Sequence, residues 1–168
     1  MSELRNRVAE SALRTIDLET LWSEPPIAIF DLKDHLFQGL VLREKEFRQA
    51  LQDHNWEQYR EKALLVYCSS DAIIPAWAPM LVASRAADFA LEVFPGDQNA
   101  YLEAKFREAI ASLDPAEFED ARVVVKGCSK RSVPPGAYIA LLNRLQPVVR
   151  TLMFGEPCST VPVYKRSR

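Results

Sequence analysis

The sequence predicts an α/β fold, specifically a three-layer αβα arrangement around a mostly parallel sheet of about five strands. Short apolar runs alternate along the chain with segments whose apolar residues recur at helical spacing. Such alternation with right-handed crossovers produces a parallel sheet covered by helices on both faces. One run, Leu64–Tyr67, is apolar without alternation, which is typical of a strand buried on both sides.

The first half of the chain supplies two clear strands and two helices. Residues 1–24 are weakly patterned apart from a short strand at 15–18, and we expect them to form an arm packed on the domain. The remaining elements follow in order: a strand at Ile27–Phe30, a loop to Gly39, a helix from Arg43 to about Asp53, the strand at Leu64–Tyr67, and a helix ending near Ala87 with Pro75 and Pro79 in or near its first turn.

The second half repeats the alternation, with capping signals at two helix starts. Asp97 is expected to cap a long amphipathic helix, and Asp114 to cap a short helical turn. The elements expected are a strand at Phe89–Phe94, the long helix to about Leu113, a strand at Arg122–Lys126, a helix between Pro134 and Pro147, and a strand at Val148–Phe154.

Composition limits the classes of protein to consider. With 168 residues, 48% hydrophobic and 26% charged, we expect a single globular domain spanning residues 1–168. No apolar run approaches the roughly 20 residues of a bilayer span, and no secretory signal is visible, so we expect a cytoplasmic protein. A net charge of −2 argues against nucleic acid as a partner. The basic end Lys165–Arg168 is expected to be a solvated tail.

Three cysteines carry the strongest chemical signal. Cys68, Cys128 and Cys158 each come at or after the end of an apolar run, and each is followed by serine. In a parallel sheet, the carboxyl ends of the strands lie at one edge, where open α/β proteins bind ligands. The three thiols are therefore expected to converge there as metal ligands. The alternative is that they only pack, because free cysteine is among the most buried residue types.

Asp71, three residues after Cys68, is the expected fourth ligand. Thiolates select zinc or iron–sulfur clusters over magnesium or calcium. The sequence lacks the short C-x2-C spacing of zinc ribbons. Other ionisable residues expected at the same edge are Asp31, Asp34, His35 and Glu156. For each of these, and for Asp71, a helix cap or a solvated loop charge is the more common role.

Other chemistries have weaker support. The chain has no C-x-x-C motif, no G-x-S-x-G motif and no glycine-rich phosphate loop. A Cys–His pair could use only His35 or His54, and His54 is expected to cap or pack at a helix end. Thiol phosphatases carry an arginine six positions after the catalytic cysteine. In this chain the residues at that offset are Ile74, Pro134 and Tyr164. Serine hydroxyls and helix N-termini at the same edge leave anion binding open.

Several long motifs resemble an uncharacterised family of mainly Bacteroidetes proteins, domain of unknown function 2480. The resemblance covers nearly the whole chain and rests on residues 30–45, 68–77, 126–128, 145–149 and 155–165. It implies no activity or catalytic residue. It does imply an association with iron–sulfur assembly proteins, which favours the thiol-ligand hypothesis over a hydrolase. It also implies an aromatic residue at the position of His35 in relatives.

The leading hypothesis is therefore a cytoplasmic accessory protein that binds a zinc ion or an iron–sulfur cluster. Its ligands would be Cys68, Cys128, Cys158 and Asp71, and its role would lie in cluster assembly or transfer. One alternative is a non-catalytic binding or interaction domain whose cysteines are structural. Another is a small thiol-dependent enzyme that uses Cys128 or Cys68.

Overall fold

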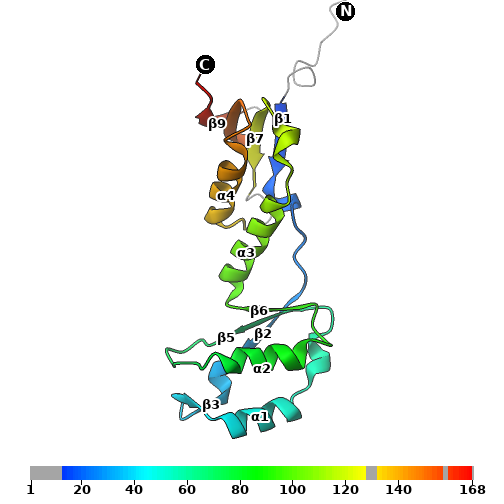
Figure 1. Cartoon of the computed structure of the whole chain (residues 1–168), viewed down its shortest axis with the longest axis vertical. Coiled ribbons are helices and arrows are strands. Elements are labelled where there is room, and N and C mark those ends of the chain that lie inside the picture. Colours follow the sequence, from blue (N-terminus) through cyan, green and yellow to red (C-terminus); the bar gives the residue numbers. More distant parts are fainter. Residues whose placement is uncertain (1–12, 128–131, 157–158, 168) are drawn as a thin grey trace, which may run out of the picture. The chain divides into compact units, whose positions relative to one another are not determined.

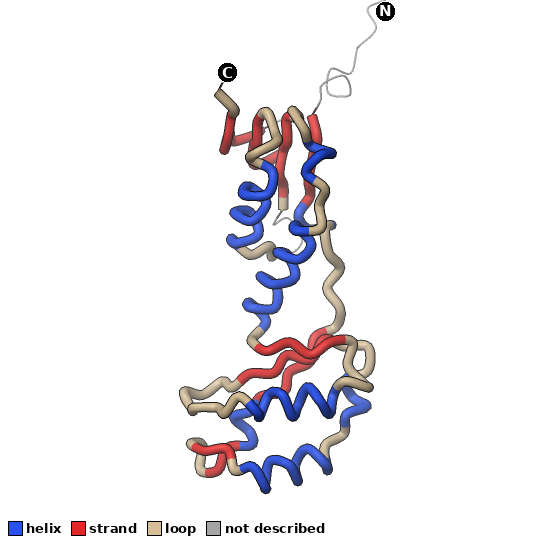
Figure 2. The backbone as a smooth tube through the Cα atoms, in the orientation of Figure 1, coloured by secondary structure: helices blue, strands red, loops and turns tan. Residues whose placement is uncertain are grey.

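The computed structural model describes residues 13–127, 132–156 and 159–167. The chain divides into two compact units. The middle unit consists of residues 24–101. The terminal unit consists of residues 13–23 together with the described residues from 102 onward. Both units combine helices with parallel strands, so the predicted α/β class is confirmed (Figures 1 and 2). The single domain expected from the sequence stays a prediction.

The terminal unit contains a four-stranded sheet in the order β1-β7-β8-β9. Strands β1, β7 and β8 are parallel, and β9 runs antiparallel to β8. The elements of this unit are β1 (Leu13–Asp17), the 3-10 helix η1 (Leu18–Thr20), α3 (Gln98–Ala111, whose first four residues belong to the middle unit), the 3-10 helix η4 (Pro115–Phe118), β7 (Arg122–Lys126), α4 (Pro135–Leu145), β8 (Thr151–Glu156) and β9 (Ser159–Lys165).

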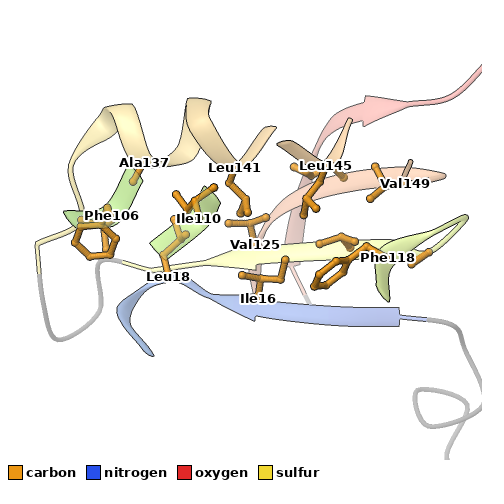
Figure 3. Packing of buried hydrophobic residues seen from close by; sticks show 14 residues of the cluster. Ile16, Leu18, Phe106, Ile110, Phe118, Val125, Ala137, Leu141, Leu145 and Val149 are labelled. Atoms are coloured by element: carbon orange, nitrogen blue, oxygen red, sulfur yellow. The ribbon is translucent and has the colours of Figure 1, made fainter. Parts of the chain in front are cut away.

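Strand β7 lies between β1 and β8, and this position explains its sequence. Val123, Val124 and Val125 are all buried, as expected for a central strand covered on both faces. Val123 and Val125 face a core that α3 and α4 complete with Phe106, Ile110 and further side chains. Figure 3 shows the buried side chains of α4 directed toward these strands.

The middle unit contains a second sheet, in the order β2-β5-β6, with all strands parallel. Its central strand β5 is buried from its first residue through Val66, as its uninterrupted apolar sequence predicts. The elements are β2 (Ile27–Asp31), η2 (Leu32–His35), the hairpin of β3 (Leu36–Phe37) and β4 (Val41–Leu42), α1 (Glu44–Asp53), η3 (Trp56–Tyr59), β5 (Ala63–Tyr67), α2 (Trp77–Ala86) and β6 (Glu92–Pro95).

The two predicted capping residues are confirmed. The backbone N–H of Ala100 donates to the Asp97 carboxylate at 2.9 Å, and that of Ala116 donates to Asp114 at 3.0 Å. Pro79 lies in the first turn of α2, where the missing N–H has no helical acceptor to lose.

The structure departs from the expected arrangement in how the strands are grouped. They are divided between a sheet of four and a sheet of three rather than joined in one sheet of about five. The segment at 13–17 is an edge strand of the four-stranded sheet. The segment Ser159–Lys165, for which the sequence predicted no strand and whose last residue begins the expected solvated tail, forms β9. Pro162 weakens the strand pattern in the sequence, although proline is tolerated on an edge strand such as β9. The register between β8 and β9 shifts at Leu152/Met153.

Candidate functional site

Cys68 directly follows β5 in the middle unit. Its side chain is half-buried and packs against the core of that unit. The Cys68 sulfur lies 3.2 Å from the hydroxyl oxygen of Ser70. The cysteine is a free thiol, placed as the sequence predicts at the carboxyl end of a parallel strand. These contacts are compatible with a ligand and with a packing residue.

Asp31 fixes the segment that carries Cys68. Strands β2 and β5 are parallel neighbours with Asp31 opposite Tyr67, so the two strand ends adjoin. The Asp31 carboxylate accepts the backbone N–H of Ser69 at 3.0 Å and that of Lys33 at 3.0 Å. Burial acts to raise the pKa of Asp31, but the hydrogen bonds from Ser69 and Lys33 outweigh it and lower the pKa overall. Asp31 is thus a capping residue.

Two of the other predicted carboxylate ligands lie at the surface. Asp71 and Asp34 are both exposed. Within the described part of the chain, no group of three or more His, Cys, Asp or Glu side chains could hold a metal ion. Asp71 therefore stays a predicted ligand from the sequence.

His35 and His54 both belong to an aromatic cluster. The His35 ring stacks on Phe30 with 4.9 Å between centroids and meets the edge of Phe47. The His54 ring packs against Phe30, and its Nε2 lies 2.7 Å from the Tyr59 hydroxyl. Burial lowers the pKa of both histidines, and a neighbouring charge on His35 lowers that of His54 further. Both rings serve packing, as expected for His54 from the sequence.

Cys128 and Cys158 lie outside the described residues, but residues on either side of them are described. Cys128 follows Gly127 just beyond β7, and Cys158 stands between β8 and β9, whose end residues Glu156 and Ser159 pair. Strands β7 and β8 are adjacent and parallel. The strands that precede the three cysteines therefore belong to two sheets, β5 to one and β7 and β8 to the other.

The carboxyl edge of the terminal sheet carries several charges. The Lys126 amino group lies 3.3 Å from a carboxylate oxygen of Asp17. The hydrogen bond and charge of Asp17, followed by the charge of Glu156, raise the pKa of Lys126. Glu156 is thus close enough for its charge to act on Lys126. Each of these two residues stands two positions before a cysteine.

A second feature, absent from the sequence-based expectations, is a hollow at the opposite edge of the terminal sheet, which we call the basic hollow. It is lined by Arg122, Arg150, Thr151, Met153, Pro162, Tyr164 and Lys165. A contiguous hollow shares Arg150 and Lys165 and adds Arg166 and Ser167. The only sequence signal was that basic residues stand at the start of β7, immediately before β8 and at the end of β9.

Comparison with known proteins identifies the family. The model of the family described as "Protein of unknown function (DUF2480)" matches residues 2–166, so the chain belongs to this family, as its motifs predicted. No curated protein and no solved structure matches the chain. Among the described helices, none is both long and apolar enough to cross a membrane.

Proposed function

We propose that this member of the DUF2480 family is a metal-binding accessory protein that holds a zinc ion or an iron–sulfur cluster through thiolates at the carboxyl edge of its terminal sheet. The observation that carries the proposal is the pairing of β7 with β8. The two strands are parallel neighbours, and each leads within a few residues to a cysteine, Cys128 or Cys158. The two cysteines therefore follow strands that end at the same edge of the sheet.

One cation of this edge stands close in sequence to a proposed thiolate ligand. Lys126 and Glu156 each stand two positions in the sequence before one of the two cysteines, and the charge of Glu156 acts on Lys126. A nearby lysine stabilises a thiolate and so lowers the pKa of a cysteine. Lys126 would also offset part of the negative charge that thiolates bring to a metal or cluster.

The proposed ligands differ from the set expected from the sequence, in which three cysteines converge at one edge of a sheet. Cys68 follows a strand of the other sheet, and the proposal rests on Cys128 and Cys158 because the strands before them are neighbours in one sheet. Cys68 and Asp71 stay predicted ligands from the sequence. Two protein thiolates leave positions for a partner or for exchange, which suits a cluster that is handed on. We further propose a cytoplasmic location, where thiols stay reduced, and partners among iron–sulfur assembly proteins.

The test is the content of iron, zinc and acid-labile sulfide in protein purified without oxygen. It is compared with a variant carrying Cys68→Ser, Cys128→Ser and Cys158→Ser, and circular dichroism checks that both proteins fold. We expect stoichiometric metal in the native protein and none in the variant. A metal-free native protein that also refuses reconstitution, with the variant equally folded, would contradict the proposal.

The second candidate is a non-catalytic binding domain with structural cysteines. The contact of Cys68 with the hydrophobic core of the middle unit and with Ser70 favours it for that residue. It predicts that Cys68→Ser lowers stability and that the native protein holds no stoichiometric metal. The metal content of the native protein therefore separates the two candidates.

A further inference from the structure

We propose that the basic hollow binds a small molecule that carries a phosphate or diphosphate group. The strand register brings its cations together. Thiol chemistry plays no part, because this edge of the sheet holds the first residues of β7 and β8, whereas the cysteines follow their last residues. The inference is therefore independent of the metal-binding proposal.

Three side chains form one row across the sheet. Arg122 on β7 is opposite Thr151 on β8, and Thr151 is opposite Lys165 on β9. Opposed residues project from the same face of a sheet, so Arg122 and Lys165 flank Thr151 at roughly 5 Å per strand. Two long cationic side chains separated by about two strand spacings can close on one anion between them.

Three of the cations that line the basic hollow have no ion-pair partner among the described residues. Arg122, Arg150 and Lys165 are exposed, and within the described ranges none of the three side chains makes an ion pair or a side-chain hydrogen bond. No Asp or Glu is among the residues that line the hollow. The cluster stands out in a chain of net charge −2. Unpaired like charges repel one another, and a bound polyanion would relieve that repulsion.

Arg166 extends the cluster and is held in a fixed place. Its guanidinium pairs with the Asp120 carboxylate at 3.5 Å and donates to the carbonyl oxygen of Val148. Its backbone N–H donates to the carbonyl oxygen of Arg150 at 3.0 Å. The end of β9 is thereby fixed beside Arg150, so the cations are presented by ordered backbone and not by a loose tail.

The size and lining of the basic hollow favour an organic phosphate over a bare ion. Its volume is about 400 Å³, which falls in the range of small-molecule sites, roughly 300–1,000 Å³. Met153, Pro162 and Tyr164 provide apolar and aromatic surface next to the arginines. An organic group attached to the phosphate could pack on this surface, while arginine gives two-pronged hydrogen bonds to phosphate oxygens.

The experiment measures the binding of ADP and of pyrophosphate to the full chain by isothermal titration calorimetry at constant ionic strength. The test variant is Arg122→Gln with Arg150→Gln. The matched control is Lys45→Gln with Arg85→Gln, which removes two exposed positive charges from the middle unit. We expect saturable binding of ADP, tighter than that of pyrophosphate, at least tenfold weaker in the test variant and unchanged in the control variant.

Three outcomes would overturn the inference. The first is that neither probe binds. The second is equal weakening in the test and control variants, which would indicate only a general effect of charge. The third is that a single-stranded oligonucleotide binds in a manner sensitive to Arg122 and Arg150 while ADP does not, which would make the basic hollow a nucleic-acid contact. Circular dichroism of both variants confirms that each comparison is made on folded protein.

Discussion

At the scale of single residues, His35 packs as a ring within an aromatic cluster. It stacks on Phe30 and packs against the edge of Phe47, so its proximity to acidic residues does not make it a ligand. Burial lowers its pKa, while the charges of Asp34 and Asp31 act in the opposite direction with less effect. Burial among these rings therefore favours the neutral form of the side chain in the folded state.

This arrangement predicts acid sensitivity. The pKa of His35 lies below its ordinary value of 6.5 in the folded state, so the unfolded state binds more protons between those two pKa values. The contribution of neutral His35 to the free energy of unfolding is fully present above about pH 6.5. It is lost as the pH falls from that value toward the lowered pKa. His35→Phe keeps the stacking and removes the titration. We expect the free energy of unfolding, measured in urea, to fall less between about pH 7 and pH 5 in this variant.

His54 contributes in the same direction, because burial lowers its pKa too, so some pH dependence remains in His35→Phe. Asp34→Asn tests the direction of this effect. It removes a negative charge that raises the pKa of His35, so the pKa should fall further and the loss of stability in acid should become steeper. An unchanged slope in His35→Phe would contradict this explanation.

Asp31 gives a second prediction at this scale. Its carboxylate accepts two backbone N–H groups, one from its own turn and one from Ser69 beside Cys68. Asp31→Ala should lower the free energy of unfolding by about 1–2 kcal/mol at pH 7. Asp34→Asn, which changes an exposed neighbour, should lie within about 0.5 kcal/mol of the native protein. Equal losses in urea titrations of the two variants would contradict a tethering role for Asp31.

At the scale of elements, the β8–β9 hairpin depends on Gly155. Its φ is +121°, and a Cβ atom there would lie 2.5 Å from the carbonyl oxygen of Ser159. Gly155→Ala should therefore cost about 3 kcal/mol or more. Gly39 also has a positive φ, +72°, but a Cβ there would meet nothing within 4 Å, so Gly39→Ala should cost only about 1–2 kcal/mol. The free energy of unfolding of each variant is measured in urea. Gly155→Ala reports the steric clash together with backbone strain, and Gly39→Ala reports backbone strain alone.

Helix α4 offers a matched pair of buried and exposed positions. Leu141 is 0% exposed and packs in the core of the terminal unit, while Ile139 is 60% exposed. Leu141→Ala should lower the free energy of unfolding by about 2–5 kcal/mol through lost burial and a cavity. Ile139→Ala should change it by less than about 0.5 kcal/mol. Similar losses in thermal or urea unfolding would show that α4 does not pack as described.

At the scale of the whole molecule, local signals predicted elements well and their grouping poorly. The buried valines of β7 and the caps at Asp97 and Asp114 are encoded in adjacent residues, so the sequence alone located them. The pairing of β1 with β7 joins segments far apart in the chain, and no local pattern specifies a strand's partner. The division of the strands between two sheets could not be predicted for the same reason.

The two candidate sites also differ in how much of each could be predicted from the sequence. Each cysteine could be placed at the end of a strand from its own neighbours. The basic hollow could not be predicted, because Arg122 and Arg150 meet through the pairing of β7 with β8 and Lys165 joins them only through the antiparallel return of β9. That strand was hidden by Pro162, which weakens a strand pattern even though an edge strand accepts it.

The most direct test of the central claim is a zinc titration, followed through competition with a colorimetric chelator, on reduced protein and two variants. If the edge of β7 and β8 supplies the ligands, Cys128→Ser with Cys158→Ser should lose at least tenfold in zinc affinity, and Cys68→Ser should lose less. If the double variant binds zinc as tightly as the native protein while both remain folded, the thiols at that edge are not the ligands and the proposed function is wrong.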